Sequence, residues 1–321
     1  MAEAICPPAL KPGDRVGILA SSAPEPFLAS SAPEPFIDSE GFERGLTALE
    51  SAGFAVAVAE TAVQEFGYRA VPEANILTDL HTFVTDPTIN AIIFAGGGKN
   101  SNRLLGGLDY SALARQPKVI VGVSDPTVLL NAITARTGLV TFHGPSVVWD
   151  WGSPEPNDLT ARHFARMVSG VAYAGRLEDA PLTALRPGQA EGQLVAGCLS
   201  AVRNLLGTPY EPSWDGAIFA WEDISKPIEL LDATLTHFRD LRVLERISGM
   251  VVGELVNCED SHGWGLTAML HDLCEDYGFP ILTGLPFGHT STKYTLPIGA
   301  RARINTDDST PLQIVGPWVS Q

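Results

Sequence analysis

Apolar and polar residues follow one another along the first half of the chain in blocks that predict strands followed by helices. Short apolar runs, bounded by glycine or polar residues, predict buried strands at 15–20, 55–59, 90–98 and 118–123. Segments with apolar residues at helical spacing separate these runs and predict helices at 41–54, 74–86 and 126–137. Strands that alternate with helices are typical of a parallel sheet covered on both faces. In such sheets, ligands bind at the carboxyl ends of the strands.

The second half of the chain has a different pattern. Residues 175–195 are rich in Gly, Pro and Ala, so we expect a linker or crossover over 171–195. A chain of 321 residues is also too long for one ordinary core. We therefore expect an α/β domain over 1–170 and a smaller α+β domain over 196–321. Within the second domain, the pattern predicts strands at 216–223, 250–256 and 300–305 and helices at 197–206, 228–244 and 265–277.

A tandem repeat follows the first predicted strand. The nine residues ASSAPEPFL (20–28) are followed at once by ASSAPEPFI (29–37). Two copies of nine residues are too short to build a solenoid. We interpret the repeat as a loop lengthened by duplication, which is either an inert insertion or a flap over a ligand site.

Charge and cysteine content narrow the function class. The chain has 21 Lys and Arg against 37 Asp and Glu, a formal net charge of −16, which disfavours nucleic acid and anionic membranes as partners. Its four cysteines (Cys6, Cys198, Cys258 and Cys274) lack metal-type spacing and predict reduced thiols. Neither a signal-peptide pattern nor an apolar run of about 20 residues is present, so we expect a cytoplasmic protein.

The segment KVIVGVSDPTVLL (118–130) places a hydroxyl and a carboxylate where a buried strand turns into a helix. A serine becomes a nucleophile when a base removes its proton and a rigid turn exposes it. The hydrolase elbow G-x-S-x-G provides such a turn, but here its second glycine is replaced by Pro126. Ser124 is therefore a candidate nucleophile, and a serine that only caps the helix fits the same residues.

A second polar segment follows another predicted strand. Gly96, Gly97 and Gly98 lead into Lys99-Asn100-Ser101. Glycines let a backbone approach a ligand closely, so an N–H group of this loop is a candidate for one half of an oxyanion hole. A plain tight turn is the alternative, whereas the phosphate-binding motifs GxGxxG and GxxxxGK[ST] are absent.

The base and the acid of a catalytic triad must come from elsewhere in the chain. His289 lies between glycine and small polar residues in a predicted loop, and His143 is the second candidate base. Glu222 emerges directly from the apolar run AIFAW, with Asp223 beside it as the alternative acid. Each of these residues also fits a purely structural role.

Several ordered blocks resemble one known family. They include GGKNSNRLL, the segment 109–145 around Ser124, AGCLSAVRNLLGTPYEP, FAWEDISKPIELLDATLTHFRDL and LPFGHTSTKYTLPIGARARIN. The chain resembles the LD-carboxypeptidase family of serine peptidases over nearly its whole length. GGKNSN is most similar to the branch that contains MccF, the microcin C self-immunity peptidase. The muropeptide-trimming branch more often has a shorter glycine–aromatic–glycine version at this place.

The resemblance implies a Ser-Glu-His triad of Ser124 as nucleophile, Glu222 as orienting acid and His289 as general base. It also implies an oxyanion hole from backbone N–H groups of Asp125 and of Gly97 or Gly98. The implied fold is a Rossmann-like α/β domain joined to a smaller domain, in a homodimer that needs no metal or organic cofactor. Two positions depart from the family pattern, since Val123 and Cys198 replace a frequent aromatic residue and an asparagine.

For the MccF branch, the implied substrate is a peptidyl or aminoacyl nucleotide whose amide follows a C-terminal acidic residue. Such hydrolysis would give self-immunity to, or detoxification of, a microcin-like antibiotic. We expect Trp149 and Trp151 to stack on a base, unless they are core aromatics, and Asn100 and Ser101 to contact the substrate. The basic residues Lys99, Arg103 and Lys293 are candidates for binding an anion. The alternatives are a muramoyl-tetrapeptide LD-carboxypeptidase and a non-catalytic small-molecule binder.

Overall fold

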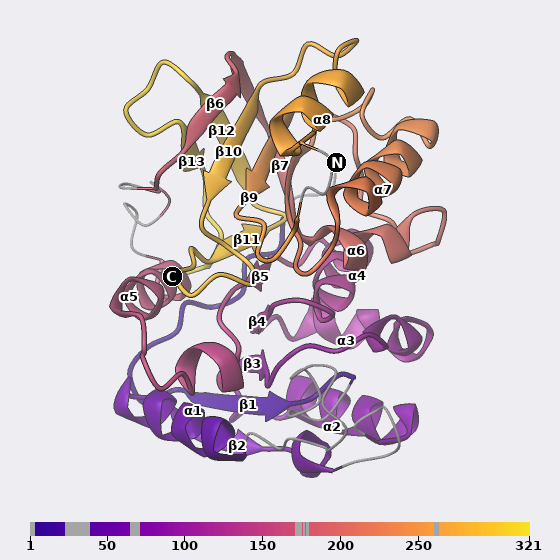
Figure 1. Ribbon diagram of the computed structural model, residues 1–321. Helices are drawn as coiled ribbons and strands as arrows, with labels where there is room; N and C mark the ends of the chain where they lie inside the picture. The colour runs from indigo at the N-terminus through magenta and orange to yellow at the C-terminus, as the bar shows by residue number, and fades with distance from the viewer. Residues whose placement is uncertain are drawn as a thin grey trace.

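Two β-sheets form the framework of the protein, one above the other in Figure 1. A computed structural model describes residues 4–22, 39–64, 71–170, 175, 177, 180–259 and 263–321. Most of the duplicated segment 20–37 therefore lies outside the described residues. The mixture of helices with a parallel first sheet confirms the α/β class expected from the sequence.

The first sheet contains the strands predicted from the first half of the chain. The described strands are ordered β11-β5-β4-β3-β1-β2, all parallel except β11 at the edge. Every residue of β3 and β4 is buried, which explains why these strands are continuous apolar runs. Their bounds are β1 Arg15–Leu19, β2 Ala55–Val58, β3 Ala91–Phe94, β4 Val119–Gly122, β5 Thr141–His143 and β11 Leu296–Ile298.

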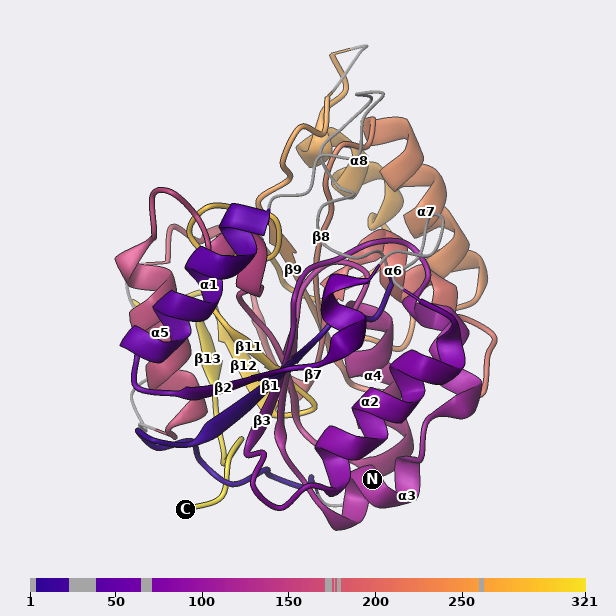
Figure 2. The ribbon, with the colours of Figure 1, turned by 90° about the horizontal axis from the view of Figure 1, so that it is seen from below.

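Helices cover both faces of this sheet. Figure 2 shows α1 and α5 on one side of the strands and α2, α3 and α4 on the other. The α-helices are α1 Ser39–Ser51, α2 Glu73–Thr85, α3 Tyr110–Arg115, α4 Thr127–Thr137 and α5 Asp158–Val168. Other helical segments are the 3₁₀ helices η1 Glu60–Val63 and η2 Ser101–Gly107 and the π-helix η3 Val147–Trp151. None of the helices in the described parts of the chain is long and apolar enough to span a bilayer.

The second sheet has a parallel centre and antiparallel edges. Its described strands are ordered β13-β12-β7-β8-β9-β10-β6, and β7, β8, β9 and β10 run parallel. The strands are β6 Thr183–Arg186, β7 Gln189–Cys198, β8 Ile218–Glu222, β9 Gly249–Gly253, β10 Ile281–Leu285, β12 Arg301–Asn305 and β13 Leu312–Ile314. Its helices are α6 Leu199–Val202, the 3₁₀ turn η5 Arg203–Leu205, α7 Ile228–Asp240 and α8 Leu266–Leu273.

The segment 171–195, which we expected to be a crossover, contains β6 and most of β7. The strand β7 pairs with β12 on one side and with β8 on the other. Glycine belongs in β7 for a steric reason, since a Cβ on Gly192 would lie 1.9 Å from the carbonyl oxygen of Gly216. In the sequence, Gly192 contributed to the prediction of a linker. In the structure, it is required because two backbone segments approach each other closely within a sheet.

Candidate active site

Ser124 lies at a sharp turn between β4 and α4. Its φ is +65°, a left-handed conformation that is costly for a residue with a side chain. The turn is tight because Gly122 lacks a side chain, and a Cβ there would lie 2.7 Å from Cβ of Pro126. The strand-to-helix elbow expected from the sequence is therefore present without the second glycine of the motif.

The glycine loop packs directly on this elbow. A Cβ on Gly97 would lie 2.8 Å from Oγ of Ser124 and 2.9 Å from the ring of Trp149, so only glycine fits. The Asp125 carboxylate accepts hydrogen bonds from the backbone N–H groups of Asn100 (2.8 Å) and Ser101 (2.7 Å). The elbow and the loop are thus joined by direct contact and by hydrogen bonds.

Glu222 and His289 form a buried hydrogen-bonded pair. Oε2 of Glu222 lies 2.7 Å from Nδ1 of His289 and also accepts the backbone N–H of that residue at 3.3 Å. Gly288 makes this approach possible because its φ is +87° and a Cβ there would lie 2.1 Å from Cδ of Glu222. A carboxylate acceptor at Nδ1 places the imidazole proton on that nitrogen and leaves Nε2 as a base.

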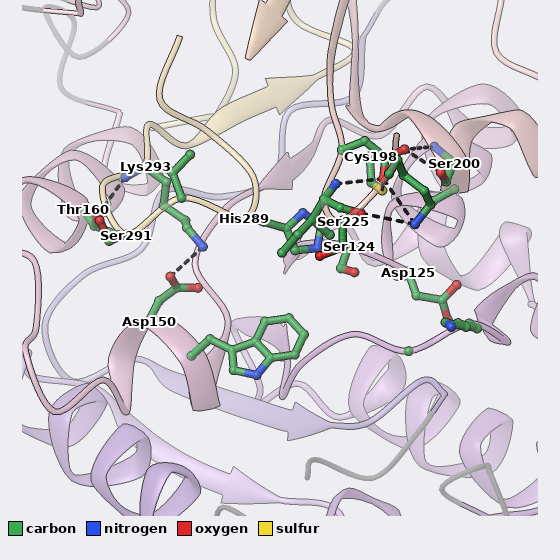
Figure 3. A pocket seen from close by; sticks show the side chains of 18 of the residues that line it. Ser124, Asp125, Asp150, Thr160, Cys198, Ser200, Ser225, His289, Ser291 and Lys293 are labelled. Carbon is green, nitrogen blue, oxygen red and sulfur yellow. Dashed lines mark hydrogen bonds and ion pairs between the residues drawn. The ribbon is translucent and has the colours of Figure 1, made fainter. Parts of the chain in front are cut away.

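Ser124 and His289 line one cavity of about 1030 Å³, although Ser124 follows β4 and His289 lies in the distant loop between β10 and β11. In Figure 3 they lie at the centre of its wall, between Lys293 and Asp150 on one side and Cys198 and Ser200 on the other. The residues that line the cavity are Gly98, Lys99, Ser124, Asp125, Trp149, Asp150, Ser153, Glu155, Asn157, Thr160, Cys198, Ser200, Ala201, Arg203, Asn204, Asp223, Ile224, Ser225, Lys226, Leu230, His289, Thr290, Ser291 and Lys293.

The cavity is lined by four basic side chains and by as many acidic ones, Asp125, Asp150, Glu155 and Asp223. Nζ of Lys293 lies 2.6 Å from the Asp150 carboxylate, and Lys226 lies 3.9 Å from Asp223. Lys99 and Lys293 were candidates from the sequence, whereas Arg203 and Lys226 were missed. Lys226 lies four residues after Glu222, in the mainly polar segment that follows the apolar run AIFAW, so its position was a usable signal.

Arg103, the third basic candidate, is not among the residues of the wall. It forms an ion pair with Glu73 on α2.

The two alternative candidates have other surroundings. His143 is 1% exposed on β5, makes an edge contact with Phe287 and does not line the cavity. Burial, with smaller contributions from the charges of His289 and Lys293, lowers the pKa of His143 to about 3. The Asp223 carboxylate accepts the N–H groups of Ser200 and Ile224 and so organises the start of α6. Neither residue contacts the imidazole of His289 by a hydrogen bond.

The four expected substrate contacts separate into two groups. Trp149 lines the cavity, and its ring centre lies 6.5 Å from that of His289. Trp151 is buried against Phe164 in the core, which leaves its ring out of the wall. Asn100 and Ser101 are also absent from the wall, and the fully buried Ser101 bonds to the hydroxyl of Ser21. Trp151, Asn100 and Ser101 therefore lie behind the residues of the cavity wall.

Cys198 lines the cavity as a neutral thiol. Burial, together with the nearby carboxylates of Glu222 and Asp223, raises its pKa well above the usual range. The four cysteines are free thiols. In the described part of the chain, no three His, Cys, Asp or Glu side chains are grouped as metal ligands.

Comparison with known proteins identifies the family to which this arrangement belongs. Residues 27–144 match the LD-carboxypeptidase N-terminal domain, and residues 191–304 match the LD-carboxypeptidase C-terminal domain. The chain belongs to the LD-carboxypeptidase family. It is therefore an enzyme of a family of serine carboxypeptidases.

Members of this family with different names resemble the chain over almost its whole length. A probable murein peptide carboxypeptidase of Bacillus subtilis is 34% identical, with 95% of this chain and 92% of that protein covered. The microcin C7 self-immunity protein MccF of Escherichia coli is 29% identical, with 92% of each chain covered.

The fold also matches solved structures from both branches. MccF in complex with glutamyl sulfamoyl guanosine superposes with a TM-score of 0.89 at 25% identity, covering 98% of this chain and 99% of that one. A muramoyltetrapeptide carboxypeptidase of Oxalobacter formigenes superposes with a TM-score of 0.79 at 26% identity, covering 95% and 100%.

Proposed function

We propose that the protein hydrolyses an amide bond through a catalytic triad of Ser124, His289 and Glu222. The observation that carries the proposal is the 2.7 Å contact between Glu222 and His289 at the wall of the cavity that also holds the strained Ser124. Nε2 of His289 takes the proton of Ser124 as Oγ attacks the scissile carbonyl carbon. Glu222 keeps the imidazole in the required tautomer and stabilises it once it is protonated.

The tetrahedral intermediate requires donors for its negative oxygen. We assign this role to the backbone N–H groups of Asp125 and Gly98. Neither group donates a hydrogen bond to an acceptor in the described protein, and both residues line the cavity. Gly97 is absent from the wall and serves instead to let the loop approach Ser124. His289 then returns the proton to the leaving amine, and water releases the acyl group from Ser124.

The MccF-type reaction is the first candidate for the substrate. It would cleave the amide between an acidic residue and a nucleotide, as in a microcin C-like conjugate, and so give self-immunity or detoxification. The support is the fold match to MccF bound to glutamyl sulfamoyl guanosine, together with an indole ring in the cavity wall next to His289. Of the four basic side chains in the wall, Lys293 and Lys226 are paired with Asp150 and Asp223, whereas Lys99 and Arg203 form no ion pair within the described residues and can pair with an anionic substrate.

A muramoyl tetrapeptide, cut before its terminal D-amino acid, is the second candidate. The 34% identity to a probable murein peptide carboxypeptidase supports this candidate. A peptide of this type also carries a free carboxylate beside the scissile bond, so the same basic side chains suit it. The two candidates share amide hydrolysis and differ in the acyl part and in the leaving group.

The test is a turnover assay with aspartyl sulfamoyl adenosine and a muramoyl tetrapeptide, run on the wild type and on Ser124→Ala. We expect the variant to lose roughly 10⁴-fold or more in turnover of the true substrate. Equal rates of wild type and variant would refute Ser124 as nucleophile. Binding without turnover, unchanged in the variant, would instead support a non-catalytic binder.

The homodimer expected from the family resemblance and the cytoplasmic location expected from the sequence pattern also belong to this proposal. Light scattering of the purified chain tests the dimer, because a monomer has half the mass of the expected species. Fractionation of the producing cells tests the location.

A further inference from the structure

Three hydrogen bonds from outside the glycine loop fix its backbone. Oδ2 of Asp125 accepts both the N–H of Asn100 at 2.8 Å and the N–H of Ser101 at 2.7 Å. At the other end of the loop, the carbonyl oxygen of Gly97 accepts a hydrogen bond from the Ser22 hydroxyl at 2.9 Å. Asp125 is 5% exposed and Ser22 is 1% exposed, so water does not substitute readily for either group.

The bond to Gly97 determines where the next N–H group points. In a trans peptide the C=O of one residue and the N–H of the next are antiparallel. The carbonyl of Gly97 points to Ser22, and hence the N–H of Gly98 points the opposite way. Gly98 lines the cavity, and its N–H has no acceptor in the described protein.

We propose that the Asp125 carboxylate and the Ser22 hydroxyl are positioning groups that aim the Gly98 N–H at the reacting oxygen. The inference rests on the proposed function and adds two residues to it. A carboxylate close to a developing oxyanion is electrostatically unfavourable, so its presence needs a reason. The two N–H bonds on one oxygen supply that reason, because they hold the loop within contact distance of Ser124.

Three variants separate this role from others. Asp125→Ala removes both acceptor bonds, Asp125→Asn can keep them through its amide oxygen while removing the charge, and Ser22→Ala releases the Gly97 carbonyl. Asp109→Ala is the matched control, because the Asp109 carboxylate also accepts a backbone N–H at 2.8 Å, from Ala112, but lies outside the cavity. Melting temperatures show whether each variant is folded.

The assay is the kcat and KM of each variant on the substrate that the wild type turns over. We expect kcat to fall ~10²-fold in Asp125→Ala, the loss typical of a missing oxyanion donor, with KM within about threefold. Asp125→Asn should rescue most of this loss, Ser22→Ala should lose about tenfold in kcat, and Asp109→Ala should match the wild type.

The outcomes distinguish the positioning role of Asp125 and Ser22 from the proposed function. Unchanged kcat in both Asp125→Ala and Ser22→Ala, or an effect on KM alone, overturns the positioning role while leaving the triad intact. Equal damage by Asp125→Asn and Asp125→Ala overturns it as well, since charge would then matter instead of the acceptor. If Asp125→Ala does not fold, Ser22→Ala and Asp125→Asn decide. Full turnover by Ser124→Ala would refute the proposed function and, with it, the positioning role of Asp125 and Ser22.

Discussion

Replacing Glu222 by glutamine removes one negative charge and exchanges one oxygen for an NH₂ group at constant size. In the wild type, Oε2 accepts from Nδ1 and from the backbone N–H of His289, whereas Oε1 is buried without a hydrogen-bond partner among the described residues. Glutamine can therefore adopt two orientations, and each removes something that the proposed mechanism needs.

In the first orientation, the amide oxygen takes the place of Oε2 and keeps both bonds from His289. The NH₂ group then occupies the partnerless site, where an unsatisfied buried donor costs about 1–3 kcal/mol. In the second orientation, the NH₂ group faces the backbone N–H of His289 and needs Nδ1 as an acceptor. The ring proton then moves to Nε2, which can no longer take the proton of Ser124.

We expect Glu222→Gln to reduce kcat by between ~10²-fold and ~10⁴-fold, the upper figure being typical of a triad with the wrong tautomer. Steady-state kinetics and thermal unfolding measure the two effects separately. Glu254→Gln is the matched control, because Glu254 is an exposed carboxylate at the end of the neighbouring strand β9. Retention of kcat within about threefold in Glu222→Gln would refute the orienting role of Glu222.

Three further predictions concern stability. Because the pKa of His143 is about 3 in the fold against an ordinary value of 6.5, the unfolded chain binds an extra proton between these pH values, and stability falls as pH drops from 6.5 toward 3. Between pH 7 and pH 4.5, the free energy of urea unfolding should fall by roughly 2–3 kcal/mol less in His143→Asn than in the wild type. An equal fall in both proteins would contradict this. Lys293→Met should cost about 3–5 kcal/mol by leaving the buried Asp150 carboxylate unpaired, and adding Asp150→Asn should recover part of the loss in the same assay. Ser124→Gly should be more stable than Ser124→Ala by about 1 kcal/mol, because glycine adopts a φ of +65° without strain; a more stable alanine variant would contradict this.

The pattern of apolar and polar residues was sufficient to predict the buried strands, the polar residues at their ends and the helix after Ser124. Strands that are buried on both faces are continuous apolar runs, so β3 and β4 could be found from the sequence. Ser124 and Glu222 were detectable because each is a polar residue at the end of such a run. The helix after Ser124 was expected at 126–137 and spans Thr127–Thr137.

Features that depend on distant partners could not be read in this way. The strand β11 joins the first sheet by pairing with β5, more than 150 residues earlier in the chain. Trp149 and Trp151 are two residues apart, yet only the first reaches the cavity because the π-helix turns the second into the core. The acceptor role of the Asp125 carboxylate was also hidden, since its partners lie 24 and 25 residues away.

In the proposed triad, Ser124 follows β4 of the first sheet, whereas Glu222 is the last residue of β8 in the second sheet. A short series of buried contacts links these two positions. Three residues after Ser124, the side chain of Thr127 packs on Gly197, where a Cβ would lie 2.1 Å from Cγ2 of that threonine. Cys198 follows in β7 and pairs in register with Glu222 in β8, which in turn holds His289. The links are a close packing contact, a backbone register and a hydrogen bond between two side chains, and together they hold Ser124 and His289 at the wall of one cavity. The proposed proton transfer from Ser124 to His289 requires such preorganisation.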